Sequence, residues 1–246
     1  MYAIDLTGKN AIVTGAGRGL GASIAETLAQ SGAQVIVVDI HEEASITDAL
    51  EAIGSHGLPP AYYRYDIAKE ENCTAIIERA EKEFGSVDIL VNNAAISRGD
   101  WIDIFKVNTL AHYYLNMAAA ESMKKRGGGK IVNITTSGTF SGGGDGIKYN
   151  ATKGGADSLT RFMAKQYAKD GIHINAVAPG PMLTELMKGY YGEDVFTDHY
   201  LNQMPKKQLL KMEEVARVVL FLSSELSDAL CGETILADAG RVRLNP

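Results

Sequence analysis

Short apolar runs alternate with longer helical segments along the whole chain of 246 residues, and this alternation constrains the fold more than any other feature. The run AQVIVVD at 33–39 is continuously apolar, which suits a strand covered on both faces of a parallel sheet. Strands that alternate with helices of this length imply βαβ units. We therefore predict an α/β fold: one Rossmann-like, doubly wound domain over 1–246, with a seven-stranded parallel sheet in the order 3-2-1-4-5-6-7 and helices on both faces.

The expected elements can be placed by their residue ranges. Strands are expected at 10–14, 33–39, 61–66, 87–94, 130–136, 172–180 and 233–240. Helices are expected from the first glycine-rich turn to about residue 30, and at 42–54, 71–85, 101–126, 147–169 and 212–224. The one long irregular region, 181–211, separates the sixth strand from the last long helix, and loops of that length are usually functional or disordered.

The composition excludes several classes of protein. The net charge is −6, so the chain as a whole lacks the basic footprint of a nucleic-acid binder. The opening MYAIDLTGKN does not read as a signal peptide, and the apolar runs fall short of a membrane span. Cys73 and Cys231 lie far apart and lack metal-ligand spacing. We expect a cytoplasmic protein with reduced thiols, no metal site, and no nucleic-acid or membrane partner.

A glycine-rich turn, TGAGRGLG at 14–21, follows the first expected strand and opens the first expected helix. Gly15, Gly19 and Gly21 permit a tight turn and a close approach of the backbone to a pyrophosphate. The helix that follows offers free N–H groups and a partial positive charge at its first turn. The alternative is an ordinary glycine-rich turn between a strand and a helix.

Asp39 ends the second strand, about twenty residues beyond the glycines. An acid at this place hydrogen-bonds the adenosine ribose hydroxyls and repels a 2′-phosphate, which favours NAD over NADP. Arg18 argues the other way, because a guanidinium pairs well with a phosphate. We give Asp39 the greater weight and predict NAD.

Tyr149 and Lys153 are four residues apart in YNATK, so they lie on one face of the expected helix 147–169. Tyr65 and Lys69 show the same spacing, so the spacing alone does not separate a chemical pair from two residues on a solvated face.

Four motifs in this order resemble the short-chain dehydrogenase/reductase family: T-G-x-x-x-G-x-G, NNAA at 92–95, Y-x-x-x-K, and PGPMLT at 179–184. The resemblance runs over nearly the whole chain. It implies an oxidoreductase that moves a hydride between a nicotinamide and a secondary alcohol or ketone. It also implies a small-molecule substrate and a homotetramer. Polyols, sugar derivatives, hydroxy acids and cyclic alcohols all remain open as substrates.

The same resemblance assigns catalytic roles. Tyr149 matches the general acid/base, Lys153 the residue that favours its phenolate and binds the nicotinamide ribose, and Asn108 the helical asparagine that holds a water in the proton relay. Moving the pKa of a tyrosine from about 10 to about 7 takes about 4 kcal/mol of differential stabilisation. The hydroxyl that polarises the substrate is either Thr136, thirteen residues before the tyrosine as is usual in the family, or Ser137, which has the usual side chain.

The resemblance also implies a set of cofactor contacts. Asp66 matches the adenine-binding acid, Asn92 the asparagine beside the adenosine ribose, and the 179–184 segment covers the nicotinamide. The whole implied set is Gly15, Arg18, Gly19, Leu20, Gly21, Asp39, Asp66, Ile67, Asn92, Ala94, Tyr149, Lys153, Pro179, Gly180 and Thr184.

Two departures leave alternatives open. The segment 93–108 is shorter than the family usually has, so the pocket is either more open or completed by 181–211 or a neighbouring subunit. Asp145 and Lys148 are polar candidates for meeting a substrate. The basic cluster KKRGGGK at 124–130 is compatible with an NADPH-dependent 3-oxoacyl-thioester reductase, in which a basic surface would bind an acidic carrier. The same residues are also typical of a helix end, where cations stabilise the last turn and glycine follows it. A non-catalytic NAD-binding sensor or scaffold is the remaining alternative.

Overall fold

The computed structural model describes residues 3–143, 146–184 and 193–244 of the chain. It confirms the expected sheet, which has seven strands in the order β3-β2-β1-β4-β5-β6-β7. Every neighbouring pair is parallel. The strands are β1 (Asn10–Thr14), β2 (Gln34–Asp39), β3 (Ala61–Arg64), β4 (Ile89–Asn92), β5 (Gly129–Ile134), β6 (Ile172–Pro179) and β7 (Thr234–Ala237).

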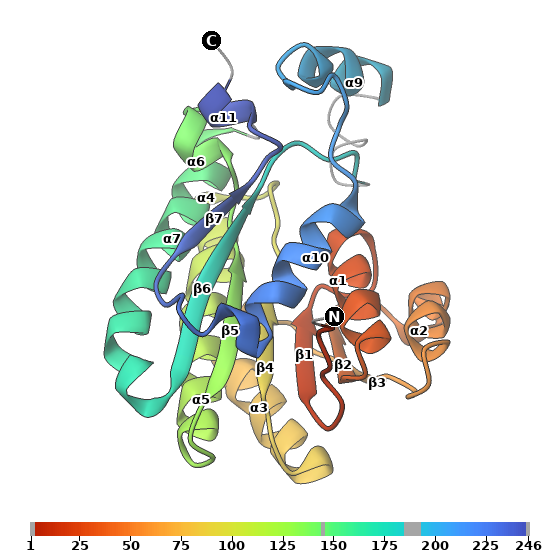
Figure 1. Cartoon of the computed structure of the whole chain (residues 1–246), viewed down its shortest axis with the longest axis vertical. Coiled ribbons are helices and arrows are strands. Elements are labelled where there is room, and N and C mark those ends of the chain that lie inside the picture. Colours follow the sequence, from red (N-terminus) through yellow and green to blue (C-terminus); the bar gives the residue numbers. More distant parts are fainter. Residues whose placement is uncertain (1–2, 144–145, 185–192, 245–246) are drawn as a thin grey trace.

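Helices cover both faces of the sheet (Figure 1). One layer holds α1 (Gly19–Gln30), α2 (Thr47–Gly54) and α10 (Met212–Leu222), and the other holds α3 (Glu70–Phe84), α5 (Ala111–Lys124) and α7 (Ile147–Tyr167). Successive residues of β2 enter opposite cores: Val35 and Val37 pack toward α1 and α10, while Ile36 and Val38 pack toward α3 and α5. This period of two, with apolar residues on both sides, explains why the strands are continuously apolar.

The helix expected at 101–126 is continuous but contains an irregular turn. It consists of α4 (Trp101–Phe105), a π-helical turn η2 (Lys106–Leu110), and then α5. A π turn shifts the backbone hydrogen-bond register by one residue and is often found at functional sites. Asn108 lies inside this turn.

Several element ends differ from expectation. The helix expected at 42–54 is split into η1 (Glu43–Ser45) and α2, because Ile46 turns inward to become buried against the glycine-rich turn at Gly17. The expected helix 147–169 ends at Tyr167 and continues as η3 (Ala168–Asp170). Most strands end before the expected residue, because the chain turns there into the loops above the carboxyl edge of the sheet.

Four short elements were not expected from the sequence. They are α6 (Gly138–Ser141), α9 (Glu193–Leu201), η4 (Glu225–Ser227) and α11 (Arg241–Leu244). In Figure 1, α9 and α11 lie beyond the carboxyl ends of the strands, and α6 lies beside α11. The irregular region 181–211 thus contains a helix, α9, in its described part. The sequence also predicts a helix that begins with ELMKGYY after Thr184, and this stretch, 185–191, lies outside the described residues.

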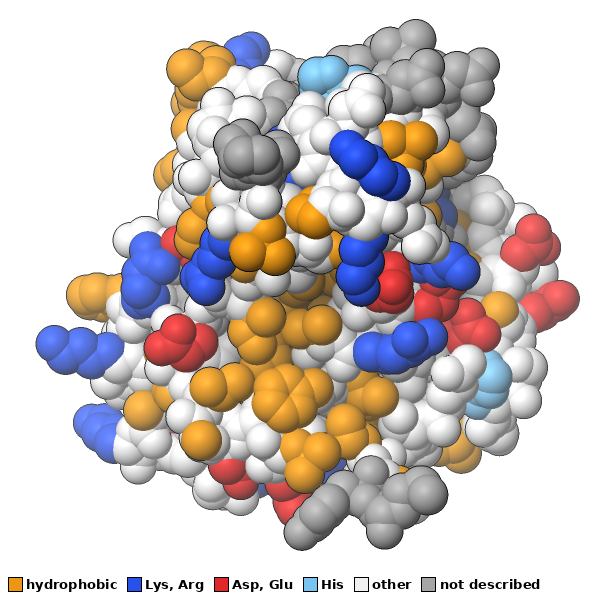
Figure 2. Space-filling view, turned by 45° about the horizontal axis from the view of Figure 1, so that its top comes forward, with side chains coloured by type: hydrophobic (Ala, Val, Ile, Leu, Met, Phe, Trp, Pro, Cys, Tyr) orange, Lys and Arg blue, Asp and Glu red, His pale blue; other side chains and the backbone are white. Residues whose placement is uncertain are grey.

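The remaining expectations concern thiols, charge and the membrane. Cys73 is buried, Cys231 is exposed, and both are free thiols. Burial raises the pKa of the Cys73 thiol to about 12, so this thiol stays protonated at neutral pH. Acidic and basic side chains are interspersed on the face that Figure 2 shows. None of the helices in the described ranges is long and apolar enough to cross a bilayer.

Candidate active site

A cavity of about 550 Å³ lies at the carboxyl ends of the strands. This is where ligands bind in doubly wound sheets, beside the point at which the strand order reverses. Most of the predicted site residues line it: Gly15, Arg18, Gly19, Leu20, Gly21, Asp39, Asp66, Ile67, Ala94, Thr136, Ser137, Tyr149, Lys153, Pro179, Gly180 and Thr184. Asn92 and Asn108 do not.

The glycine-rich turn forms a cradle that side chains would fill. Gly15 has φ +64°, and a Cβ on it would lie 2.8 Å from the Cα of Ala94. A Cβ on Gly21 would lie 2.1 Å from the carbonyl oxygen of Gly15. No side chain caps the start of α1, where Arg18 is extended (φ −165°, ψ 171°). The first N–H groups of α1 are therefore open to an anion, and the cradle fits a dinucleotide pyrophosphate.

Asn93 fastens this cradle to the end of β4. Its Nδ2 donates to the carbonyl oxygens of Thr14 (3.0 Å) and Gly15 (3.2 Å). In return the Thr14 hydroxyl oxygen accepts the backbone N–H groups of Asn93 (3.0 Å) and Ala94 (3.1 Å). The second asparagine of NNAA is thus a structural clamp of the cofactor loop, a role that the sequence analysis did not assign.

Asp39 connects the loop after β2 to the glycine-rich turn. Its Oδ2 accepts the N–H of Gly17 (2.9 Å), and its Oδ1 accepts the N–H of Ile40 (2.8 Å) and the ring Nδ1 of His41 (2.6 Å). Burial raises the pKa of Asp39, but the hydrogen bonds from His41 and Gly17 outweigh burial, so the net pKa lies below the ordinary value. The group is a carboxylate at neutral pH, at the cavity wall. His41 also lines the cavity and was not predicted.

Lys153 and Tyr149 enter the cavity from one face of α7, as their spacing predicts. The Lys153 Nζ lies 5.9 Å from the centre of the Tyr149 ring and donates to the carbonyl oxygen of Ile134 at 2.6 Å. Lys153 is only 1% exposed, and this burial lowers its pKa to about 7. An ammonium that exchanges its proton near neutral pH suits a proton relay to a neighbouring phenol.

Thr136 and Ser137 both line the cavity, but they differ in setting. Thr136 is half-buried, and its hydroxyl oxygen accepts the N–H of Gly138 at 3.2 Å. Because that bond uses the oxygen as acceptor, the hydroxyl hydrogen of Thr136 remains for a ligand. Ser137 is 3% exposed, and its backbone N–H donates to the carbonyl oxygen of Pro179. The geometry favours Thr136 as the donor to a substrate oxygen.

Asn108 acts on the cavity from behind its wall. Its Oδ1 accepts the N–H of Ile96 (2.9 Å), and its Nδ2 donates to the Ile96 carbonyl (2.8 Å) and to the Thr152 hydroxyl (3.1 Å). The side chain thereby holds the π turn, the segment after β4 and α7 together. The water-holding role inferred from the resemblance stays a prediction.

Other polar candidates lie away from the cavity. Asn92 is buried in the sheet and donates to the side-chain oxygens of Asn116 (2.6 Å) and Asn133 (2.9 Å), so its own side chain faces the interior. Lys148 donates to the carbonyl of Gly99 at 3.2 Å and does not line the cavity. Asp145 falls outside the described residues.

Tyr65 and Lys69, which have the same spacing as Tyr149 and Lys153, do not lie on one helix face. Tyr65 follows β3, and Lys69 is the residue before the first turn of α3. Tyr65 does line the cavity, at its adenosine end beside Asp66. The spacing of four residues is therefore chemically meaningful only in YNATK, where a helix carries it.

The basic cluster lies at the amino edge of the sheet, opposite the cavity. Lys124 is the last residue of α5, and Lys125 and Arg126 follow it before β5 begins at Gly129. Lys124 pairs with Asp170 (3.8 Å) and Lys125 with Glu81 (3.4 Å). This placement favours the role of a helix end over that of a carrier-docking surface beside the site.

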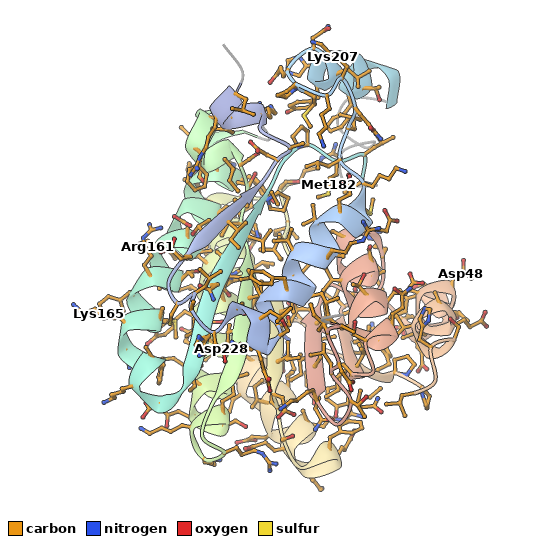
Figure 3. The ribbon with its side chains drawn as sticks, in the orientation of Figure 1. Asp48, Arg161, Lys165, Met182, Lys207 and Asp228 are labelled. Atoms are coloured by element: carbon orange, nitrogen blue, oxygen red, sulfur yellow. The ribbon has the colours of Figure 1, made fainter. Side chains whose placement is uncertain are left out.

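The rest of the cavity wall comes from the segment after β4 and from residues after β6, in part outside the motifs. The short segment after β4 contributes Ala95, Ile96 and Arg98. Met182, Tyr200 and Arg241 complete the wall from 181–184, α9 and α11. Figure 3 shows Met182 between the carboxyl edge of the sheet and the segment that carries Lys207. The described part of 181–211 thus supplies walls that the short segment does not.

Known proteins match this chain over nearly its full length. The family model described as enoyl-(acyl carrier protein) reductase matches residues 15–241. The chain is 34% identical to 2-dehydro-3-deoxy-D-gluconate 5-dehydrogenase of Escherichia coli strain K12, over 98% of each chain. It is 34% identical to 3-oxoacyl-[acyl-carrier-protein] reductase of Aquifex aeolicus, over 96% of this chain and 98% of that one. Gluconate 5-dehydrogenase of Burkholderia cenocepacia, solved with NADP and tartrate, superposes with a TM-score of 0.89 at 31% identity, over 97% and 96% of the chains.

Proposed function

The chain belongs to the short-chain dehydrogenase/reductase family and is a nicotinamide-dependent oxidoreductase of CH–OH groups, and from this premise we propose that it is an NAD-dependent dehydrogenase of a sugar-derived secondary alcohol. One observation carries the proposal: the glycine cradle, Asp39, Tyr149, Lys153 and Thr136 all line a single cavity. Relatives named for gluconate derivatives support the sugar-derived substrate.

Each of these residues has its own role in the proposed reaction. When bound, the nicotinamide supplies the hydride acceptor or donor. Thr136 donates a hydrogen bond to the reacting oxygen, and Tyr149 removes its proton during oxidation or returns it during reduction. Lys153 stabilises the phenolate by its charge and takes part in proton exchange, helped by a pKa near neutrality. Burial of Lys153 keeps competing water away from its ammonium, so the charge acts more strongly on the phenol.

The choice of NAD rests on Asp39. A carboxylate and one charge of a 2′-phosphate repel each other by about 4 kcal/mol at about 4 Å and an effective dielectric constant of about 20. Four N–H donors hold the Asp39 carboxylate in place at the cavity wall. Several solved relatives hold NADP, which makes NADP the competing cofactor, and Arg18 at the cavity wall is the residue that would favour it.

We also expect a homotetramer. Trp101 and Ile102 on α4 and Phe162 on α7 are exposed large apolar side chains on the helix layer of the catalytic residues. Exposed apolar groups on neighbouring helices support burial between subunits. Size-exclusion chromatography with light scattering tests this, because it gives the mass of the assembly directly.

A carrier-dependent 3-oxoacyl-thioester reductase is the second candidate, because the Aquifex aeolicus relative is as similar as the sugar-acid enzyme. The position of 124–126 at the opposite edge of the sheet argues against it. A strong NADPH preference, with activity lost on neutralising Lys124, Lys125 and Arg126, would establish it instead. A non-catalytic scaffold is not favoured, because the proton-transfer groups line the cofactor cavity.

A turnover screen tests the proposal. Polyols, hydroxy acids and sugar acids are offered with NAD and with NADP while nicotinamide reduction is followed, with the Tyr149→Phe variant in parallel. We expect turnover with NAD on a sugar-derived substrate and its loss in the variant, which still binds NADH. Equal turnover by Tyr149→Phe, or turnover on 3-oxoacyl thioesters alone, would refute the proposal.

A further inference from the structure

Arg241 is a buried guanidinium at the cavity wall without an acidic partner. It is the first residue of α11, is 9% exposed, and lines the cavity. Among the described residues no carboxylate lies within 4.0 Å of it. A buried charge is normally paired, because desolvation without a counter-charge is costly.

Neutral groups hold this guanidinium in place. Gln203 Oε1 accepts from Nε at 3.0 Å and from Nη2 at 2.7 Å, which fixes one edge of the planar fork. The Tyr200 ring lies 5.3 Å from the guanidinium carbon. The Nη1 group has no hydrogen-bond partner in the part of the chain that the structure describes. One edge is thus clamped, and the outer Nη1–Nη2 edge is open to a planar anion.

The acidic side chains that line the cavity lie far from Arg241. Asp39 ends β2 and Asp66 follows β3, both at one side of the sheet. Arg241 follows β7 at the other side, five strand positions from β2, which is about 24 Å at about 4.8 Å per strand. The acids therefore do not neutralise Arg241, and Arg98, Arg18 and Lys153 are further cations in the lining of the cavity.

We propose that Arg241 is a specificity-determining residue whose outer edge binds the carboxylate of the substrate, so that the enzyme acts on sugar acids in preference to neutral polyols. This inference rests on the proposed function and narrows its substrate class. The planar fork matches a carboxylate bidentately, and Gln203 acts as the positioning residue that orients it. Tyr149 and Thr136 line the same cavity, and Thr136 follows β5, only two strand positions from β7.

The test compares two substrates that differ only at the anchored end. D-Gluconate carries a carboxylate where D-glucitol carries a CH₂OH group. We expect the wild type to favour D-gluconate in kcat/KM, and Arg241→Met to lower kcat/KM for D-gluconate by about 10- to 100-fold, mainly through KM. The kcat/KM for D-glucitol is expected to fall much less, so that the ratio of the two kcat/KM values drops.

Arg243→Met is the matched control, because Arg243 is on the same short helix but exposed. It is expected to leave the ratio of the two kcat/KM values unchanged. Melting temperature and NADH affinity check that each variant is folded. If Arg241→Met does not fold, Arg241→Lys replaces it and is expected to lose the preference at least fivefold, because an ammonium does not reproduce the fork.

Two failures are distinguishable. If the wild type oxidises neither compound with either cofactor, the proposed function fails. Calorimetric titration of D-gluconate into the NADH-loaded wild type and into Arg241→Met then still tests the anchor. Binding that Arg241→Met abolishes would support it. Two results would overturn the proposal. One is a ratio of kcat/KM for D-gluconate to kcat/KM for D-glucitol that is unchanged in a folded Arg241 variant. The other is equal affinity of the wild type and Arg241→Met for D-gluconate.

Discussion

Gly21 offers the sharpest test of the cofactor cradle. An alanine there places its Cβ 2.1 Å from the carbonyl oxygen of Gly15 and 2.5 Å from Nδ2 of Asn93. The first of these neighbours is backbone and the second is clamped to Thr14 and Gly15, so the loop itself must move. Overpacking of this kind costs about 1–3 kcal/mol of stability. In a protein of this length the melting temperature then falls by about 2–12 °C.

The displaced loop also loses contacts to the pyrophosphate. One or two hydrogen bonds to a charged group contribute about 1.5–3 kcal/mol each. Since about 1.4 kcal/mol is tenfold in affinity, Gly21→Ala is expected to weaken NADH binding by about 10- to 100-fold or more. The assay is a fluorescence titration of NADH, with the melting temperature measured in parallel.

Gly154→Ala is the matched control in α7. The nearest atom to its added Cβ is Cγ2 of Thr139 at 3.8 Å, which is ordinary contact. Alanine inside a helix stabilises by about 0.5–1 kcal/mol relative to glycine, so this variant is expected to melt slightly higher and to bind NADH normally. NADH affinity within twofold of the wild type in Gly21→Ala would refute the assignment of 14–21 as the pyrophosphate loop.

Three further predictions follow from the same geometry. Thr136→Val is expected to lower kcat by about 10²–10³-fold, and Thr136→Ser is expected to restore it. Ser137→Ala is expected to change kcat less than tenfold. A large loss in Ser137→Ala and a small one in Thr136→Val would identify Ser137 as the polarising group. Asp39→Asn is expected to reduce the ratio of NAD to NADP kcat/KM at least tenfold, and an unchanged ratio would move the cofactor choice to other residues. His112 is fully buried with neither ring nitrogen hydrogen-bonded in the described structure, and burial together with the nearby Lys153 charge lowers its pKa well below the ordinary value. The unfolded chain takes up that proton near pH 6.5 and the folded chain does not, so the free energy of unfolding should fall below pH 6.5 by up to about 1.4 kcal/mol per pH unit. Urea titrations at several pH values should show that the free energy of unfolding of His112→Leu depends less on pH than that of the wild type. The same dependence on pH in both proteins would contradict this.

The fold was largely predictable because the spacing of apolar residues along the sequence differs between strands and helices. QVIVVD alternates between two cores, and both sides are apolar, so the strand and its burial follow directly. The ends of elements were less predictable, because packing decides them. Ile46 interrupts a good helical pattern only because the glycine-rich turn lies next to it in space.

The site divides in the same way. The glycines, Tyr149 and Lys153 carry their meaning in local spacing, so the motifs place them at the cavity. Asn93 and Arg241 carry theirs in contacts with residues far along the chain, such as Thr14 for the first and Gln203 for the second. The motif NNAA contains Asn93 but does not reveal its contacts with Thr14, no motif contains Arg241, and only the structure shows what either residue touches.

The central claim is that this chain moves a hydride between nicotinamide and a carbinol carbon with Tyr149 as the proton donor. NADH deuterated at C4, separately on each face, is supplied with 5-keto-D-gluconate, and the product is analysed by mass spectrometry and NMR. One deuterium at the new carbinol carbon, from one face only, and no product from Tyr149→Phe is the expected result. NADH oxidation without deuterium in the product, or equal product from Tyr149→Phe, would contradict the claim.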